Sequence, residues 1–260
     1  MMTSKRHVTI YQLLIHMISC RNLTRSFGDK VALQSVGFDL AAGEICALLG
    51  PNGAGKSTLL AILAGTLTAT DGEATVADIE VKPGSLELRR RIGVLPENLG
   101  LFDDLTIDEH LQLTCDLFGV PRAEAELRID KILGLFDLEG DRNAFASACS
   151  HGMRKKTAIA MAMLPRPRVL LLDEPFEGID PVTAKVLERT LREASKRGVT
   201  TLMATHVLAS VEQVATRILI LRNGQIVWRA FAEGLEEPLE AIYLKEIGYT
   251  NEDYLPWHVS

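Results

Sequence analysis

The stretch GPNGAGKST, Gly50 to Thr58, decides how this chain of 260 residues folds. It fits the pattern GxxxxGK[ST] and stands between the apolar run EICALLG, residues 44–50, and a helical segment that begins at Lys56. A strand, a glycine-rich turn and a helix N-terminus in this order form a phosphate-binding loop. The turn lets backbone N–H groups converge on phosphate oxygens, and the helix dipole attracts the anion. The sequence therefore predicts an α/β fold built around a nucleoside triphosphate.

Two side chains of this loop have roles of their own. Lys56 is expected to neutralise the β and γ phosphates, and the Ser57 hydroxyl is expected to ligate Mg²⁺. The other members of the predicted phosphate site shape the loop or offer backbone groups: Gly50, Pro51, Asn52, Gly53, Ala54, Gly55 and Thr58. A chance glycine-rich turn is the alternative, and the strand-to-helix context argues against it.

A second element, VLLLDEP at residues 169–175, is an apolar strand that ends in two carboxylates. Asp173 is placed to hold Mg²⁺ directly or through a water. Neighbouring residues at a strand end point in different directions, so Glu174 can serve the attacking water as a general base or orienting group. The alternative is that the two acids merely end a strand in solvent, and the presence of the phosphate loop argues against it.

The first half of the chain contains an opening β region and then a helical insertion. Strands are expected at residues 18–27 and 31–40, and a strand pair at 72–81. Helical periodicity follows from residue 105 to 138, with Thr106 as N-cap and Glu109 three residues later as a capping box. Pro121 is expected to open the second helix of this insertion. We place the whole helical insertion at about residues 98–165.

The second half alternates buried strands with helices. After the strand at 169–175 we expect a helix at 182–196, a strand at 199–206, a short helix at 209–215 and a hairpin at 217–228 with Asn-Gly at its turn. This alternation predicts a mostly parallel sheet core. The fold class is therefore α/β, of the P-loop NTPase type, with an antiparallel β subdomain and the helical insertion.

Bulk properties exclude several classes of protein. The net charge of −6 argues against a nucleic acid as the main partner, because such binders usually carry a basic face. The four cysteines show no CxxC spacing, which favours free thiols over a zinc or iron–sulfur site. The apolar residues 8–19 follow a basic segment like a short secretory signal, but Gln12 and His16 interrupt them. No stretch reaches the roughly 18 to 20 apolar residues of a membrane span.

With the phosphate loop and the acidic strand end in hand, the chain from about residue 17 to 227 resembles the ATP-binding subunits of ATP-binding cassette (ABC) transporters. The resemblance implies an ATPase with ATP and Mg²⁺ as cofactors. Family members begin close to Met17, so residues 1–16 are expected to be an extension or a misassigned start. Residues 228–260 are expected to form a C-terminal tail.

The resemblance also implies roles for three residues outside the two motifs. Phe27 matches the aromatic ring that stacks on adenine. Asp180, in the D-loop EGIDP (residues 177–181), is expected to face the phosphate loop of a second subunit. His206 matches the switch histidine that contacts the γ-phosphate and helps Glu174 to orient the water.

Two positions depart from the common family pattern. Glu97 replaces the glutamine that contacts Mg²⁺ or the water and relays to the membrane partner; a carboxylate can still ligate Mg²⁺, and we hypothesise that it keeps the coupling role. The signature CSHGM, residues 149–153, replaces LSGGQ but keeps Ser150 and Gly152, which the resemblance sends to the γ-phosphate of the opposite subunit.

Three cations follow the signature at the start of a helix: Arg154, Lys155 and Lys156. Cations there oppose the helix dipole, at about 0.3 to 1 kcal/mol each. We expect either that a docked anion offsets this cost or that the side chains are simply solvated.

The implied function is an ATP-driven motor for a separate integral membrane permease, resembling the ABC-2 type exporter group. One phosphate loop and one signature per chain imply a homodimer or a pair with a related ATPase. Such a subunit would be cytoplasmic and peripheral on the inner face of the cell membrane. The alternative is a soluble ABC ATPase that acts on the ribosome or on DNA, although the chain has a single cassette and a short helical insertion.

Overall fold

The structure is a computed structural model that describes residues 16–249. The strands are β1 (His16–Phe27), β2 (Lys30–Ala41), β3 (Ile45–Leu49), β4 (Asp71–Val76), β5 (Ile79–Glu80), β6 (Ile92–Leu95), β7 (Val169–Asp173), β8 (Thr200–Ala204), β9 (Arg217–Arg222) and β10 (Gln225–Phe231). The helices are α1 (Lys56–Leu63), α2 (Leu86–Arg89), α3 (Ile107–Phe118), α4 (Arg122–Phe136), α5 (His151–Met163), α6 (Pro181–Lys196), α7 (Leu208–Val214) and α8 (Leu239–Ile247). The expected extension at 1–16 lies outside the described residues except for its last residue, and so do residues 250–260 of the expected tail.

The central sheet has six strands in the order β10-β9-β3-β8-β7-β6. Its neighbouring strands are parallel, apart from the antiparallel β9–β10 hairpin. Every residue of β3, β7 and β8 is buried, as expected for parallel strands that are covered on both faces. The predicted α/β fold with a mostly parallel core is confirmed.

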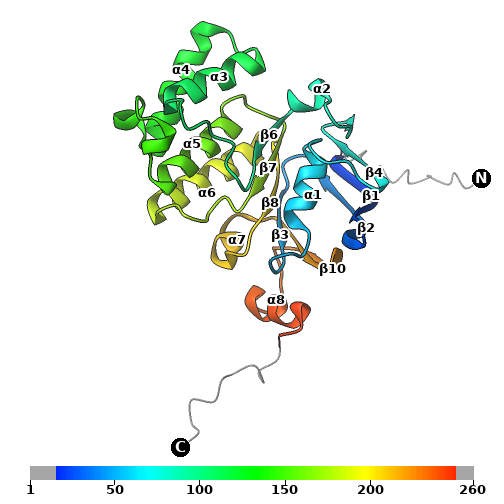
Figure 1. The fold of residues 1–260 in the computed structure, drawn as a ribbon. Helices are drawn as coiled ribbons and strands as arrows, with labels where there is room; N and C mark the ends of the chain where they lie inside the picture. The colour runs from blue at the N-terminus through cyan, green and yellow to red at the C-terminus, as the bar shows by residue number, and fades with distance from the viewer. Residues whose placement is uncertain (1–15, 250–260) are drawn as a thin grey trace, which may run out of the picture.

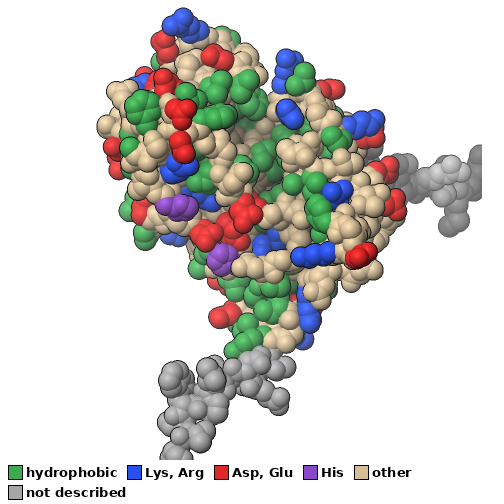
Figure 2. All heavy atoms as spheres, in the orientation of Figure 1, with side chains coloured by type: hydrophobic (Ala, Val, Ile, Leu, Met, Phe, Trp, Pro, Cys, Tyr) green, Lys and Arg blue, Asp and Glu red, His purple; other side chains and the backbone are tan. Residues whose placement is uncertain are grey.

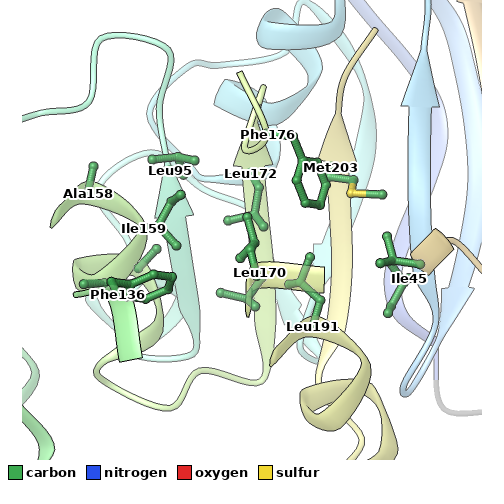
Figure 3. Packing of buried hydrophobic residues seen from close by; sticks show 14 of the residues in the cluster. Ile45, Leu95, Phe136, Ala158, Ile159, Leu170, Leu172, Phe176, Leu191 and Met203 are labelled. Atoms are coloured by element: carbon green, nitrogen blue, oxygen red, sulfur yellow. The ribbon is translucent and has the colours of Figure 1, made fainter. Parts of the chain in front are cut away.

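Two hydrophobic cores fill the two faces of this sheet. Alternate residues of β3 enter different cores. Ala47 packs on the side of α3 to α8, and Leu48 packs on the side of α1. Figure 3 shows the first core, where Leu170 and Leu172 of β7 lie between the helical insertion and Leu191 of α6. The central sheet is therefore fixed from both sides, which holds the ends of β3, β7 and β8 in place.

The opening β region forms the second sheet, which is antiparallel and has the order β2-β1-β4-β5. It lies beside α1 (Figure 1). The helical insertion, α3 to α5, lies on the other side of the central sheet (Figure 1). Its predicted capping box is present: the Thr106 hydroxyl accepts from Glu109 N at 3.2 Å, and the Glu109 carboxylate accepts from Thr106 N at 2.7 Å.

The chain beyond residue 227 is folded as far as the structure describes it. Strand β10 continues to Phe231, and α8 packs on the first core through the buried Leu239 and Ile242. Between residues 16 and 249, none of the helices combines the length and the apolar character that crossing a membrane requires.

Candidate nucleotide site

The phosphate loop connects β3 to α1 and is packed so closely that two of its glycines have no room for a side chain. A Cβ added to Gly50 would lie 2.2 Å from the carbonyl oxygen of Leu221, and one added to Gly55 would lie 2.5 Å from that of Ala32. Gly55 also has a φ of 109°, which L side chains rarely adopt. The loop is thus held between β2 and β9, with its open side at the carboxyl end of β3.

Lys56 is held inside this loop. Its Nζ donates hydrogen bonds to the carbonyl oxygens of Gly50 at 2.7 Å and Pro51 at 3.3 Å, and the side chain is buried. Because the loop curls around its own lysine, the positive charge is already fixed where a triphosphate would lie. This geometry agrees with the predicted phosphate-neutralising role, which stays a prediction.

The structure brings the expected metal ligands together at the end of β7. Asp173 is buried there, and burial raises the pKa of its carboxyl group. The Ser57 hydroxyl donates a hydrogen bond that lowers this pKa, whereas the charges of Glu97 and Glu174 raise it. In the described part of the chain, no three His, Cys, Asp or Glu side chains are grouped to hold a metal by themselves. A hydroxyl and one or two carboxylates instead suit Mg²⁺, which keeps waters and shares phosphate oxygens.

Glu174 and His206 form a direct pair across the ends of β7 and β8. His206 Nδ1 lies 3.0 Å from Glu174 Oε2, and the backbone N–H of His206 donates to the same oxygen at 3.2 Å. Glu174 adopts a left-handed backbone with a φ of 46°, a strained conformation of the kind found at functional sites. The carboxylate can only accept, so the shared proton belongs on Nδ1, which leaves Nε2 free for a further contact. Figure 2 shows acidic side chains gathered at the hollow between the two lobes of the molecule.

Phe27 is 46% exposed at the end of β1. The Arg25 guanidinium carbon lies 4.3 Å from the centre of the Phe27 ring, so one ring face already has a cation as its neighbour. The opposite face is the one that this arrangement leaves for a base. The sequence analysis missed Arg25, although its position two residues before Phe27 places both side chains on one face of a strand.

Glu97 follows β6 and lines a cavity of about 960 Å³. Ser57 and Asp173 stand on its wall together with apolar residues that include Leu86, Leu117 and Phe118. The sequence analysis did not predict α2, which supplies Leu86, because four helical residues are too few to show a period. The cavity thus joins the expected metal ligands to an apolar surface of the helical insertion.

The signature lies away from the phosphate loop. Ser150 is the N-cap of α5, and its Oγ accepts from Met153 N at 3.2 Å. Helix α5 packs in the core on one face of the central sheet, whereas α1 packs in the core on the other face. Between residues 16 and 249, no hydrogen bond links Ser150 or Gly152 with residues 50–58. The predicted site therefore falls into two separate parts within one chain.

The expectation that the three cations after the signature are simply solvated was wrong, because all three have partners within the chain; the docked anion stays a prediction. Arg154 pairs with Asp103 at 2.9 Å and donates to the carbonyl of Ala146 at 2.8 Å. Lys155 is buried, which lowers the pKa of its ammonium group, and its Nζ lies 3.4 Å from the carbonyl oxygen of Asp173. These in-chain contacts offset part of the repulsion from the helix dipole.

The third cation, Lys156, lies 3.5 Å from Asp180 Oδ2 in the D-loop. Asp180 caps α6: its Oδ1 accepts from Val182 N at 3.0 Å and Thr183 N at 2.9 Å. Hydrogen bonds from Thr183 and the charge of Lys156 hold the pKa of Asp180 well below its usual range. Asp180 therefore fixes the D-loop in this chain, and its expected contact with a second subunit stays a prediction.

Comparisons with known proteins bear on the family and the fold of this chain. A family model described as ABC transporter matches residues 33–177. The Nod factor export ATP-binding protein I of Rhizobium meliloti (strain 1021) is 36% identical over 207 residues, which are 80% of this chain and 62% of that protein. This chain therefore spans less than two thirds of the length of that relative. The ABC transporter ATP-binding protein NatA of Bacillus subtilis (strain 168) is 31% identical over 226 residues, 85% of this chain and 92% of that protein.

A solved structure supports the fold independently. It is a dimeric ATP-binding cassette in a post-hydrolysis state, bound to ADP and Pi. It matches with a TM-score of 0.75 and 26% identity, and the match covers 84% of this chain and 100% of that one.

Proposed function

The chain belongs to the ABC transporter family, and from this premise we propose that it binds and hydrolyses ATP to drive export through a separate membrane permease. The observation that carries this proposal is the meeting of three strand ends. The phosphate loop follows β3, Asp173 and Glu174 end β7, and His206 follows β8. Ligands of open α/β sheets bind at the carboxyl ends of the strands, where these groups converge.

Different residues bind the nucleotide and the metal ion. Lys56 and the backbone N–H groups of residues 50–58 hold the triphosphate, and Phe27 offers its ring to adenine. Ser57, Asp173 and Glu97 are the residues that would hold Mg²⁺, which neutralises phosphate charge when it is bound.

The Glu174–His206 pair handles the attacking water. Glu174 accepts a proton from the water as it attacks the γ-phosphate. His206, held through Nδ1, presents Nε2 toward the reacting phosphate and keeps the Glu174 carboxylate in position.

We further propose that two copies of the chain, or this chain and a related ATPase, complete each other's sites. Ser150 is exposed and Gly152 is partly exposed at the start of α5, which packs on the opposite face of the central sheet from α1. They therefore cannot close over the nucleotide of their own chain without a large rearrangement. The dimeric cassette that matches in fold supports this arrangement. Across the dimer, the signature of one copy would contact the γ-phosphate held by the other.

The cavity beside Glu97 is the proposed receptor for the permease. Its walls combine apolar residues of α2 and α3 with Glu97 and Asp173. A helix of the permease inserted there would contact the apolar wall and Glu97 together, which links docking to the expected Mg²⁺ ligands. In this role the subunit would act at the inner face of the cell membrane.

A soluble ATPase that acts on the ribosome or DNA is the alternative. The relatives described above are named for export or for a transporter, which favours the permease. The net charge of −6 also disfavours a polyanionic partner.

Phosphate release from ATP tests the catalytic part of the proposal. The purified chain should release phosphate in the presence of Mg²⁺, and chelation of the metal should stop the reaction. A Lys56→Ala variant serves as control for contaminating ATPases. A wild-type rate that equals the Lys56→Ala rate would overturn the proposed activity.

Copurification tests the partner. The chain should copurify with a polytopic membrane protein. A Leu117→Asp variant should lose this partner, because Leu117 lines the cavity and is 71% exposed. Leu127→Asp is the matched control, since Leu127 is 62% exposed on α4 and is not among the residues that line the cavity. Copurification with ribosomes instead would support the alternative.

A further inference from the structure

His151 is the residue of the signature that the proposed mechanism leaves without a role. It is the first residue of α5, directly after the N-cap Ser150, and its side chain is exposed. Its neighbours Ser150 and Gly152 already account for the expected contacts with a phosphate. A bulky imidazole at this place needs a separate explanation.

The structure supplies one contact that explains it. A Cβ added to Gly178 of the D-loop would lie 2.6 Å from Cδ2 and 2.7 Å from Nε2 of the His151 ring. The third nearest atom, at 3.9 Å, also belongs to this ring. The imidazole therefore fills the space that a side chain at position 178 would occupy. Gly178 also has a φ of 75°, a conformation that glycine adopts readily because it has no Cβ.

Two neighbouring contacts join the same two segments. A Cβ on Gly152 would lie 3.4 Å from the carbonyl oxygen of Gly178, and Lys156 pairs with Asp180 at 3.5 Å. The first two turns of α5 thus meet the D-loop at positions 151, 152 and 156. Among these contacts, only that of His151 places a side chain in the space left free by the glycine at position 178.

We propose that His151 is a positioning residue that locks the signature to the D-loop of its own chain, so that both segments meet the second protomer as one rigid surface. The proposal rests on the ATP-dependent dimer proposed above. Ordering an interface before association avoids a loss of conformational entropy during association. Removal of the His151 ring should therefore weaken dimerisation and leave ATP binding by the single chain unchanged.

The test uses the full chain with Glu174→Gln, in which slow hydrolysis preserves the ATP-bound state. Sedimentation velocity with MgATP gives the dimer dissociation constant, and a fluorescent ATP analogue gives the affinity of the monomer. His151→Ala should raise the dimer dissociation constant about three- to tenfold, the range expected from losing the order of one side chain. His151→Gln, which keeps a planar polar end, should fall between the parent and the alanine variant.

Gly178→Ala provides the reciprocal test. Its new methyl group displaces the exposed His151 ring and adds backbone strain at a φ of 75°, so this variant should weaken the dimer at least as much as His151→Ala does. The double variant His151→Ala/Gly178→Ala should be no weaker than Gly178→Ala alone, because the methyl group has already displaced the ring. Gly198→Ala is the matched control: Gly198 has a φ of 86° with no atom within 4 Å of an added Cβ, so it reports backbone strain alone.

The outcomes separate this inference from the proposed function. If the parent neither hydrolyses ATP nor dimerises with it, the proposed function fails, and the lock fails with it. If the parent dimerises and folded His151→Ala matches it, the lock alone is wrong. A double variant that adds the full effect of His151→Ala to that of Gly178→Ala would also overturn the lock, because the ring would then act independently of Gly178.

Discussion

The two parts of the proposed ATP site are built in different ways. In the phosphate part, the residues that matter for chemistry cap no helix: Lys56 reaches into its own loop, and Glu174 pairs with His206. In the signature part, the same side chains also shape the backbone, since Ser150 caps α5 and Asp180 caps α6. Substitutions should therefore separate function from stability in the first part and combine them in the second.

Glu174→Gln should give the largest effect and a pure loss of chemistry. The amide keeps the size of the carboxylate but cannot take up the proton of the attacking water, so the rate constant kcat should fall about 10²- to 10⁴-fold. The affinity for ATP and the melting temperature should stay close to those of the wild type. Phosphate release, nucleotide binding and thermal unfolding are the three measurements. Glu177→Gln, at an exposed carboxylate in the D-loop, is the control, and an equal loss in that variant would contradict the special role of Glu174.

Lys56→Ala should weaken ATP binding about 10- to 100-fold, because hydrogen bonds to a charged group contribute about 1.5 to 3 kcal/mol. Titration with a fluorescent ATP analogue measures this loss. The effect should shrink with AMP, which lacks the β and γ phosphates. An unchanged ratio of ATP to AMP affinity would show that Lys56 does not act on those phosphates.

Mixing two inactive variants tests whether the two parts work across a dimer. Lys56→Ala keeps a sound signature, and Gly152→Asp keeps a sound phosphate loop. A mixed dimer of the two holds one complete site, so the mixture should release phosphate faster than either variant alone. Lys56→Ala mixed with Glu174→Gln is the control, since both lesions there affect the phosphate part and each site still has one. No gain in the first mixture would show that the signature serves its own chain.

Ser150→Ala should lower stability and hydrolysis together. Loss of an N-cap costs about 1 kcal/mol, which is about 2 to 4 °C in melting temperature for a protein of this size. Thr106→Ala removes the N-cap of α3 and should cost a similar amount, but its hydrolysis should be unchanged. Equal loss of activity in the two variants would mean that Ser150 matters only as a cap.

Asp173→Asn should give the smallest effect on the ligand-free protein, a rise in melting temperature. Burial raises the pKa of Asp173 above its ordinary value of 3.8, so the ionised carboxylate destabilises the folded state at neutral pH. The gain from the amide should fall as the pH drops through the raised pKa, because the wild-type carboxyl group is then neutral as well. Thermal unfolding without nucleotide, from pH 4 to about 8, measures this gain. A gain that grows on acidification would contradict the direction of the pKa shift.

The sequence predicted the elements whose signals are local. The phosphate loop has its strand and helix on either side, and the capping box from Thr106 to Glu109 spans four residues. The sequence could not predict the partners of the cations after the signature, because those contacts join distant segments. Arg154 meets Asp103 across 51 positions, and Lys155 meets the carbonyl of Asp173 across 18. Charge patterns within one helix contain no information about which loop will lie against it.

The same limit explains why His151 looked irregular. Next to LSGGQ it is a bulky replacement for a glycine, and only the fold shows that Gly178 offers the space for its ring. The cavity beside Glu97 was also beyond reach, because its wall combines residues of α2, α3, α5 and the loop after β6. Both features depend on tertiary packing, whereas the motif residues themselves could be identified from their order.

The carbonyl oxygen of Asp173 has a consequence for how this chain can evolve. The side chain of Asp173 belongs to the phosphate part, yet its backbone carbonyl accepts from the buried Lys155. Lys155 lies in α5, the helix that begins within the signature. A substitution that shifts the end of β7 would thus disturb a site in its own chain and, through α5, a site in the second copy. One mutation there would impair two ATP sites at once. The rate of substitution at this strand end should therefore be lower than for other apolar strands of similar length.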